Sequence, residues 1–166
     1  MAISQALKEI YASAPYTSRY IETLSFSHSL FAQTYYVTND NAPWTFLLET
    51  GVSVTFASMP FKIVLPKNDN KGNQDMALTI ANIGRDLVDP LEAAIAKPSE
   101  PVKCAYRVYL NQANSIPQNS PPTTLVLTGV QVARDAISAT ATRADVLNRA
   151  FPFNFYRYEQ FPGLRR

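Results

Sequence analysis

The sequence predicts a mainly β protein, an antiparallel β-sandwich or split barrel with one flanking helix and a short N-terminal helix. Three observations predict it: apolar and polar residues alternate along much of the chain, helical periodicity is confined to short runs, and 166 residues match one domain. Such alternation is typical of half-buried strands that pack as layers or close into a barrel. We expect a helical arm at 1–15, a β domain at 16–148 and an aromatic C-terminal arm at 149–166.

The first element is a short helix over residues 4–14. Its apolar residues recur at one-turn spacing on one face: Leu7, Ile10, Tyr11 and Ala14. Pro15 ends the helix because proline cannot donate the next helical hydrogen bond. A helix this short is marginal in isolation, so we expect its apolar face to dock on the β domain.

Four stretches before residue 82 alternate with a period of two and are predicted strands. Their inward residues are Leu24, Phe26, His28 and Leu30; Val52, Val54 and Phe56; Phe61, Ile63 and Leu65; and Met76, Leu78 and Ile80. The last two strands flank "PKNDNKGNQD" at 66–75. This polar run, rich in Asn and containing Gly72, predicts a hairpin with a long tip.

A second helix is predicted by "DPLE". Asp89 is placed as the N-cap, Pro90 at the first helical position and Glu92 at the third, and Pro98 stops the helix after Lys97.

The second half of the chain continues with strands. Val102, Cys104, Tyr106, Val108 and Leu110 share one face, opposite Lys103 and Arg107. The fourteen residues 111–124 have no periodic signal but contain three prolines, and a loop of that length usually has a function. Strands at 125–132 and 137–141 follow, then a helical turn at 144–148, giving seven to nine strands in all.

Composition excludes several partners. Only 17% of the residues are charged and the net charge is +2, so we expect no nucleic-acid sequence recognition and no binding to an anionic membrane. No window approaches the roughly 20 apolar residues of a membrane span, and the first residues do not form a signal peptide. A single cysteine excludes an internal disulfide framework and fits synthesis in a reducing cytoplasm.

Catalytic, metal and cofactor sites are not predicted. His28 is the single histidine, so any nucleophile–His pair must use it, and its place on a strand favours a hydrogen-bonded core residue. Aligning Gly72 as the sixth residue of an EF-hand loop puts Lys67 in the first ligand position, so that motif fails. An irregular calcium site at Asp69, Asn70 and Asp75 stays open beside a solvated tip. Cys104 is predicted to be a buried apolar residue.

The five glycines form neither a phosphate-binding loop nor a dinucleotide fingerprint. We therefore expect a protein that is not an enzyme and needs no cofactor.

The C-terminal arm is the densest aromatic cluster. Six of the eleven residues from Phe151 to Phe161 are aromatic, and ordering a chain end costs roughly 1–2 kcal/mol per residue. A groove must therefore hold the arm, either on its own domain or on a neighbour. Arg157 lies between two tyrosines, which leaves base stacking as an alternative, although few basic residues surround it.

Several segments together resemble a phage-encoded family of small minor tail proteins, classed as a domain of unknown function and found in siphophage tail-tip gene clusters. These are "FKIVLPKNDNKGNQDMALTIANIGRDLVDPLEAAI", "CAYRVYL", "LVLTGVQV" and "LNRAFPFNFYRYEQFPGL". The "LTIANIG" strand leading into a helix is also similar to the start of lambda-like tail-tip proteins. The resemblance covers residues 53–164, and the closing "FPGL" is its most distinctive word.

This resemblance implies a structural protein of the virion. The chain would lie at the distal tip of a long non-contractile tail, as a trimeric or hexameric ring that joins the tail tube to the hub or central fibre, with the tape measure protein as a further neighbour. The implied fold is of the tail-tube type, two packed antiparallel sheets beside a helix, and the family supplies no catalytic residues.

We expect the aromatic arm to supply the contacts between subunits, through Phe151, Phe153, Phe155, Tyr156, Tyr158, Phe161 and Leu164. The loops at 66–75 and 111–123 are expected to reach partners. Alternatives are a tail-completion or assembly factor, and a carbohydrate-binding module for receptor recognition. A peptidoglycan hydrolase ranks last.

Overall fold

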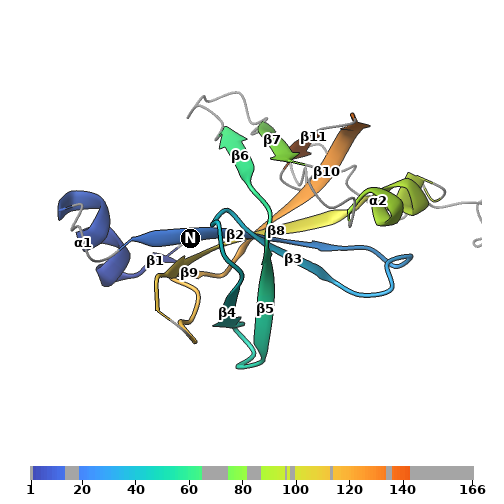
Figure 1. Ribbon diagram of the computed structural model, residues 1–166. Helices are drawn as coiled ribbons and strands as arrows, with labels where there is room; N and C mark the ends of the chain where they lie inside the picture. Colours follow the sequence, from blue (N-terminus) through green and yellow to red (C-terminus); the bar gives the residue numbers. More distant parts are fainter. Residues whose placement is uncertain are drawn as a thin grey trace, which may run out of the picture.

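The structure is a computed structural model (Figure 1), which describes residues 2–13, 19–64, 75–81, 87–95, 97, 100–112, 114–133 and 136–142. Strands make up most of these residues and two helices accompany them, which confirms the mainly β prediction. The helices are α1 (Gln5–Ser13) and α2 (Val88–Ile95). The strands are β1 (Ala2–Ile3), β2 (Tyr20–Ser27), β3 (Tyr35–Thr38), β4 (Trp44–Leu47), β5 (Ser53–Ser58), β6 (Phe61–Val64), β7 (Asp75–Ala81), β8 (Lys103–Leu110), β9 (Asn119–Ser120), β10 (Thr123–Val132) and β11 (Ala136–Thr142).

Nine of the described strands form one open mixed sheet in the order β4-β5-β3-β2-β8-β10-β11-β7-β6. Its neighbours are antiparallel except β3 and β5, which pair in parallel. The chain reverses direction twice between these two strands, so it returns beside β3 in the same direction. The mainly antiparallel arrangement predicted from the sequence therefore has one exception, at this pair.

The two ends of the sheet meet where the chain passes from β5 to β6. In the sheet order β5 lies beside the strand at one end, and β6 is the strand at the other end. Met59 donates a backbone hydrogen bond of 3.0 Å to Thr38 at the end of β3, and Pro60 accepts one of 2.9 Å from Ala81 at the end of β7. In Figure 1, β5 and β6 follow one another from the β4–β5 hairpin at the bottom to β7 at the top. The open ladder therefore curls around one interior.

A large, mostly aliphatic core fills that interior. It contains Leu24 and Phe26 from β2, Leu78 and Ile80 from β7, and further buried residues of β8, β10 and β11. The α2 helix covers part of it with Leu91 and Ala94, and Leu87 lies beside them just before the helix, so α2 is the flanking helix that the sequence predicted.

A small aromatic core lies on the other face of β2 and β8, under the β4–β5 hairpin. Its buried members are Ile21, Phe46, Phe56 and Tyr109. The rings of Phe46 and Tyr109 stack with centroids 4.3 Å apart, and Trp44 stacks on Phe46 at 5.6 Å. Both faces of β2 and β8 are thus buried, each by a different part of the chain.

The start of α2 differs from its prediction. The helix begins at Val88, and the Leu87 carbonyl accepts the first helical hydrogen bond from Leu91, so Asp89 lies in the first turn and is not the N-cap. Leu87 is 1% exposed in the large core, and its burial fixes the helix start in place of a polar cap. Pro90 still fits the first turn, where its missing N–H is not needed.

The segment 111–123 is held on its own domain. Asn114 donates to the Thr45 carbonyl and Leu47 donates to the Ser115 carbonyl, so this segment covers the outer edge of β4. Further along, β9 pairs with β1. The side-chain oxygen of the buried Asn119 accepts a hydrogen bond of 3.0 Å from the Val108 amide. Asn119 thereby covers the edge of β8 beyond the residues that pair with β10. The sequence did not predict β9.

Candidate functional site

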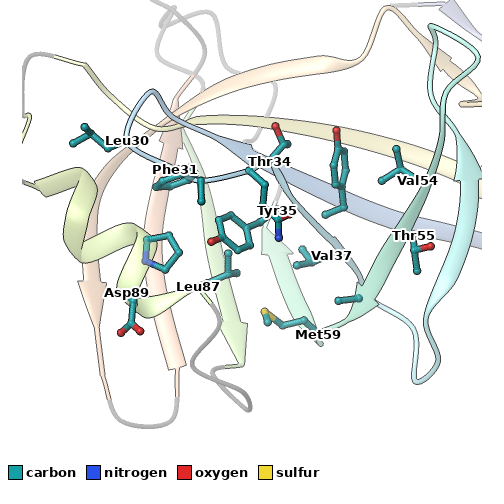
Figure 2. Close-up of a pocket in the computed structure, with 15 residues that line it drawn as sticks. Leu30, Phe31, Thr34, Tyr35, Val37, Val54, Thr55, Met59, Leu87 and Asp89 are labelled. Carbon is teal, nitrogen blue, oxygen red and sulfur yellow. The ribbon is translucent and has the colours of Figure 1, made fainter.

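A large concave surface, which we call the β3–β5 groove, lies between residues 30–34, β3, β5 and the start of α2. It has a volume of about 1030 Å³. Figure 2 shows Leu30, Phe31 and Leu87 toward one side and Val54 and Thr55 on the opposite side, with Val37 and Met59 between them.

The groove exists because β3 and β5 separate after two residue pairs. Their ladder comprises Val37–Ala57 and Thr38–Ser58, while β5 stays paired with β4 back to Ser53. Within the described part of the chain, the first half of β3 and residues 53–56 of β5 have no ladder partner on the sides that face each other. Two strand edges therefore flank the groove, and such edges readily pair with another chain.

Aromatic side chains from both cores line the groove. The rings of Phe31 and Tyr35 pack edge to face with centroids 5.6 Å apart, and both residues pack against the large core. Tyr36 packs edge to face on Phe56 at 5.3 Å and belongs to the small core. Leu30 at the rim is 48% exposed. These residues favour binding of an apolar or aromatic surface.

A single histidine holds the loop at the groove rim. The Leu30 amide donates to His28 Nδ1 at 3.1 Å, so the ring proton lies on Nε2, which donates to the Glu100 carbonyl at 2.8 Å. His28 follows β2 and is half-buried, with the satisfied hydrogen bonds expected of a structural residue. Its two hydrogen bonds position the loop.

Beside His28, a surface cluster fixes Glu100. Hydrogen bonds from Lys97 Nζ at 2.6 Å and Ser29 Oγ at 2.7 Å, together with the Lys97 charge, lower the pKa of Glu100 to about 2. The carboxylate is thus ionised over the ordinary pH range and tethers the end of the α2 segment to the loop.

Cys104 is completely buried in the large core, as predicted. Burial raises the pKa of its thiol to about 12, with a smaller opposing effect from Arg107. The thiol is therefore neutral and unreactive toward solvent reagents.

A second, smaller hollow lies beside two exposed tyrosines. Tyr11 on α1 and Tyr20 on β2 are 54% and 41% exposed, and their ring centroids are 5.1 Å apart. The hollow has a volume of about 230 Å³ and is lined by Arg19, Tyr20, Ile21, Glu22, Asn39 and Asp40. We call it the Tyr20 hollow.

Charged groups of the Tyr20 hollow are fixed by hydrogen bonds. Arg19 pairs with Asp40 at 2.6 Å, and the Tyr106 hydroxyl donates to Glu22 at 2.9 Å. Burial would raise the pKa of Asp40, but hydrogen bonds from Trp44 and Asn41 and the charge of Arg19 outweigh it and lower the pKa. The hollow therefore presents ordered carboxylates next to an aromatic ring.

The contact residues predicted from the sequence lie outside the described residues. These are Phe151, Phe153, Phe155, Tyr156, Tyr158, Phe161 and Leu164. Asp69 and Asn70 of the irregular calcium site and the turn at 144–148 also lie outside them.

Sequence reasoning did not identify the groove residues Phe31, Tyr35 and Tyr36. The aromatic pair in "QTYYV" was an available signal. Within the described residues, no group of three or more His, Cys, Asp or Glu side chains is placed to hold a metal ion. No helix in the described ranges is long and apolar enough to cross a membrane.

No curated protein matches the chain. A family model described as a domain of unknown function, DUF1833, matches residues 6–156. This match spans most of the 166 residues, from the second residue of α1 to fourteen residues beyond β11. The chain therefore belongs to the DUF1833 family.

Proposed function

We propose that this chain is a structural component of the distal tip of a long non-contractile phage tail. In this role it joins the tail tube to the hub or central fibre, is made in the host cytoplasm and ends in the virion. It forms a ring of three or six copies, contacts other tail proteins including the tape measure protein, and performs no catalysis. The similarity of residues 53–164 to phage minor tail proteins supports this role.

The observation that carries the proposal is the β3–β5 groove. Its aromatic lining and two flanking strand edges suit the addition of a strand from a neighbouring subunit, the means by which tube-type subunits continue one another's sheets. An assembly protein needs such a surface, and the groove joins elements from both cores.

The fold is compatible with a split barrel of the tail-tube type. The sheet curls until its ends meet at residues 59 and 60, and α2 flanks the large core. The β4–β5 hairpin adds a second layer over β2 and β8. These features agree with two packed layers beside a helix.

A phage that carries this gene provides the test. Particles made when the gene is silenced should have tail tubes that lack a complete tip, and complementation with the full chain should restore them. The chain should also be present in purified virions at a fixed number of copies per tail. A chain absent from mature virions but required for tail assembly is the outcome for an assembly factor and would contradict the structural role.

A carbohydrate-binding function is the second candidate, and the Tyr20 hollow supports it. An exposed tyrosine beside Glu22, Asn39 and Asp40 offers a sugar ring a stacking face and hydrogen-bond partners. A glycan array would show binding that Tyr20→Ala removes and that the control Ile116→Ala, at another exposed apolar residue, retains. Absence of binding by the unaltered chain would eliminate this candidate.

A further inference from the structure

We propose that the β3–β5 groove binds the aromatic segment 151–161 of a second copy of this chain as an added strand. The inference rests on the proposed function, which requires contacts between copies, and it names the receiving surface and its occupant.

The groove offers strand edges to an extended segment. Among the described residues, the backbone at Tyr35 and Tyr36 has no ladder partner toward β5, and residues 53–56 have none toward β3. An extended segment that enters the gap can pair with backbone groups of these edges. An apolar helix or a folded domain would leave these edges unpaired.

The segment has matching chemistry. Phe151, Phe153 and Phe155 alternate with Pro152 and Asn154, so an extended backbone presents the three rings on one face. The groove presents Phe31, Tyr35 and Met59, which offer edge-to-face and sulfur–aromatic contacts.

The charge at the groove rim is complementary to a charge of the segment. Asp89 is exposed in the first turn of α2, where the helix dipole stabilises a carboxylate. Arg157 follows the three phenylalanines by two residues and can pair with Asp89 at the rim. An exposed pair of this kind contributes little affinity but favours one direction of the bound segment.

The area is sufficient for a stable contact. A buried aromatic side chain removes roughly 150–250 Å² from water, so the three phenylalanines bury on the order of 600 Å² on one partner. This approaches the roughly 800 Å² that each partner contributes to a standard protein interface.

The proposed ring favours a second copy as the source. Passing each segment to the groove of the next copy closes a ring in which all subunits make the same contact.

Photo-crosslinking of the full chain tests this. Phe153 is replaced by p-benzoylphenylalanine, and equal amounts of unlabelled and ¹⁵N-labelled chains are mixed, irradiated and digested. We expect cross-links from residue 153 to peptides containing Phe31 or Tyr35, with pairs of mixed isotope. Cross-links confined to chains of one isotope, or to peptides outside the groove, overturn the proposal.

A matched pair of variants provides a second measurement. Leu30→Asp places a charge on the groove rim, and Ile116→Asp places one at an exposed apolar residue on segment 111–123. Sedimentation should show association of the full chain that Leu30→Asp weakens about tenfold or more and Ile116→Asp leaves unchanged. A full chain that stays monomeric at all concentrations, or equal effects of the two variants, contradicts the proposal.

The two proposals fail separately. Mixed-isotope cross-links in the groove, from a chain that is absent from virions, would remove the tail-tip role and keep the groove contact. A chain that is present at the tail tip but forms no cross-links in its groove would keep the tail-tip role and remove the groove contact.

Discussion

The two cores on opposite faces of β2 and β8 are built from different residues. The large core is mainly aliphatic and draws on seven strands and α2, whereas the small core is aromatic and depends on one hairpin, β4–β5. Cys104 faces the first, and Tyr109 belongs to the second. The difference suggests that the large core holds the domain together and the small core holds the hairpin in place beside the groove.

Phe26→Ala should have the largest effect. Phe26 is 1% exposed in the large core, and truncation of a buried phenylalanine costs about 3–5 kcal/mol through lost burial and a cavity. Urea denaturation followed by circular dichroism should show a lower midpoint for the whole transition. A loss below about 1 kcal/mol would mean that the large core is not what stabilises the domain.

Phe46→Ala should come next and should act locally. Phe46 is fully buried, but its ring partners are Trp44, Phe56 and Tyr109 in the small core. We expect a loss of about 3 kcal/mol and faster hydrogen exchange in β4 and β5, with β7 and β11 still protected. Equal loss of protection in all four strands would show that the two cores unfold as one unit.

Alkaline pH should weaken both cores together. Burial raises the pKa of the Cys104 thiol to about 12 from 9.0, and burial also raises the pKa of the Tyr109 hydroxyl. Above the ordinary pKa values the unfolded chain loses these protons while the folded chain keeps them. Stability should therefore be constant below about pH 9 and fall above it.

The fall should approach about 1.4 kcal/mol per pH unit for each such group. Urea midpoints between pH 8 and 11 measure the slope. Tyr109→Phe should make the fall of stability with pH shallower above pH 10. An unchanged slope would contradict the raised pKa of the Tyr109 hydroxyl.

Tyr109→Phe at neutral pH should have the smallest effect. Within the described residues the buried Tyr109 hydroxyl has no hydrogen-bond partner, so removing it costs nothing and can add up to about 1 kcal/mol. The matched control Tyr106→Phe loses the hydrogen bond to Glu22 and should cost about 1 kcal/mol. A larger loss for Tyr109→Phe than for Tyr106→Phe would reveal an interaction of that hydroxyl.

Local alternation was sufficient to predict the large core. Leu24, Phe26, Leu78 and Ile80 lie inward as expected, because each belongs to a long strand with one consistently apolar face. The β6–β7 hairpin and the pairing of β10 with β11 agree with the predicted strands for the same reason.

The small core could not be predicted in this way. β3 and β4 have four residues each, too few for a periodic signal, and the burial of Thr23 depends on where the hairpin folds. Arg107, predicted to lie opposite the apolar face, is covered there as well. It pairs with Glu49 at 2.7 Å and donates to Ser25 at 2.7 Å.

The sequence patterns did not predict the groove either. It arises where the β3–β5 ladder stops after Thr38–Ser58 and Val37–Ala57, and the length of a ladder depends on tertiary packing. The sequence identified the aromatic arm as a segment that needs a surface, but it did not identify the groove that we propose receives it.

A density map of the tail tip from virions of a phage that carries this gene would be the most direct measurement. We predict a closed ring of this chain in which every β3–β5 groove contains an extended segment of the adjacent copy, with phenylalanine rings beside Phe31 and Tyr35. A tail tip without this chain, or a ring whose grooves contain no part of a neighbouring copy, would contradict it.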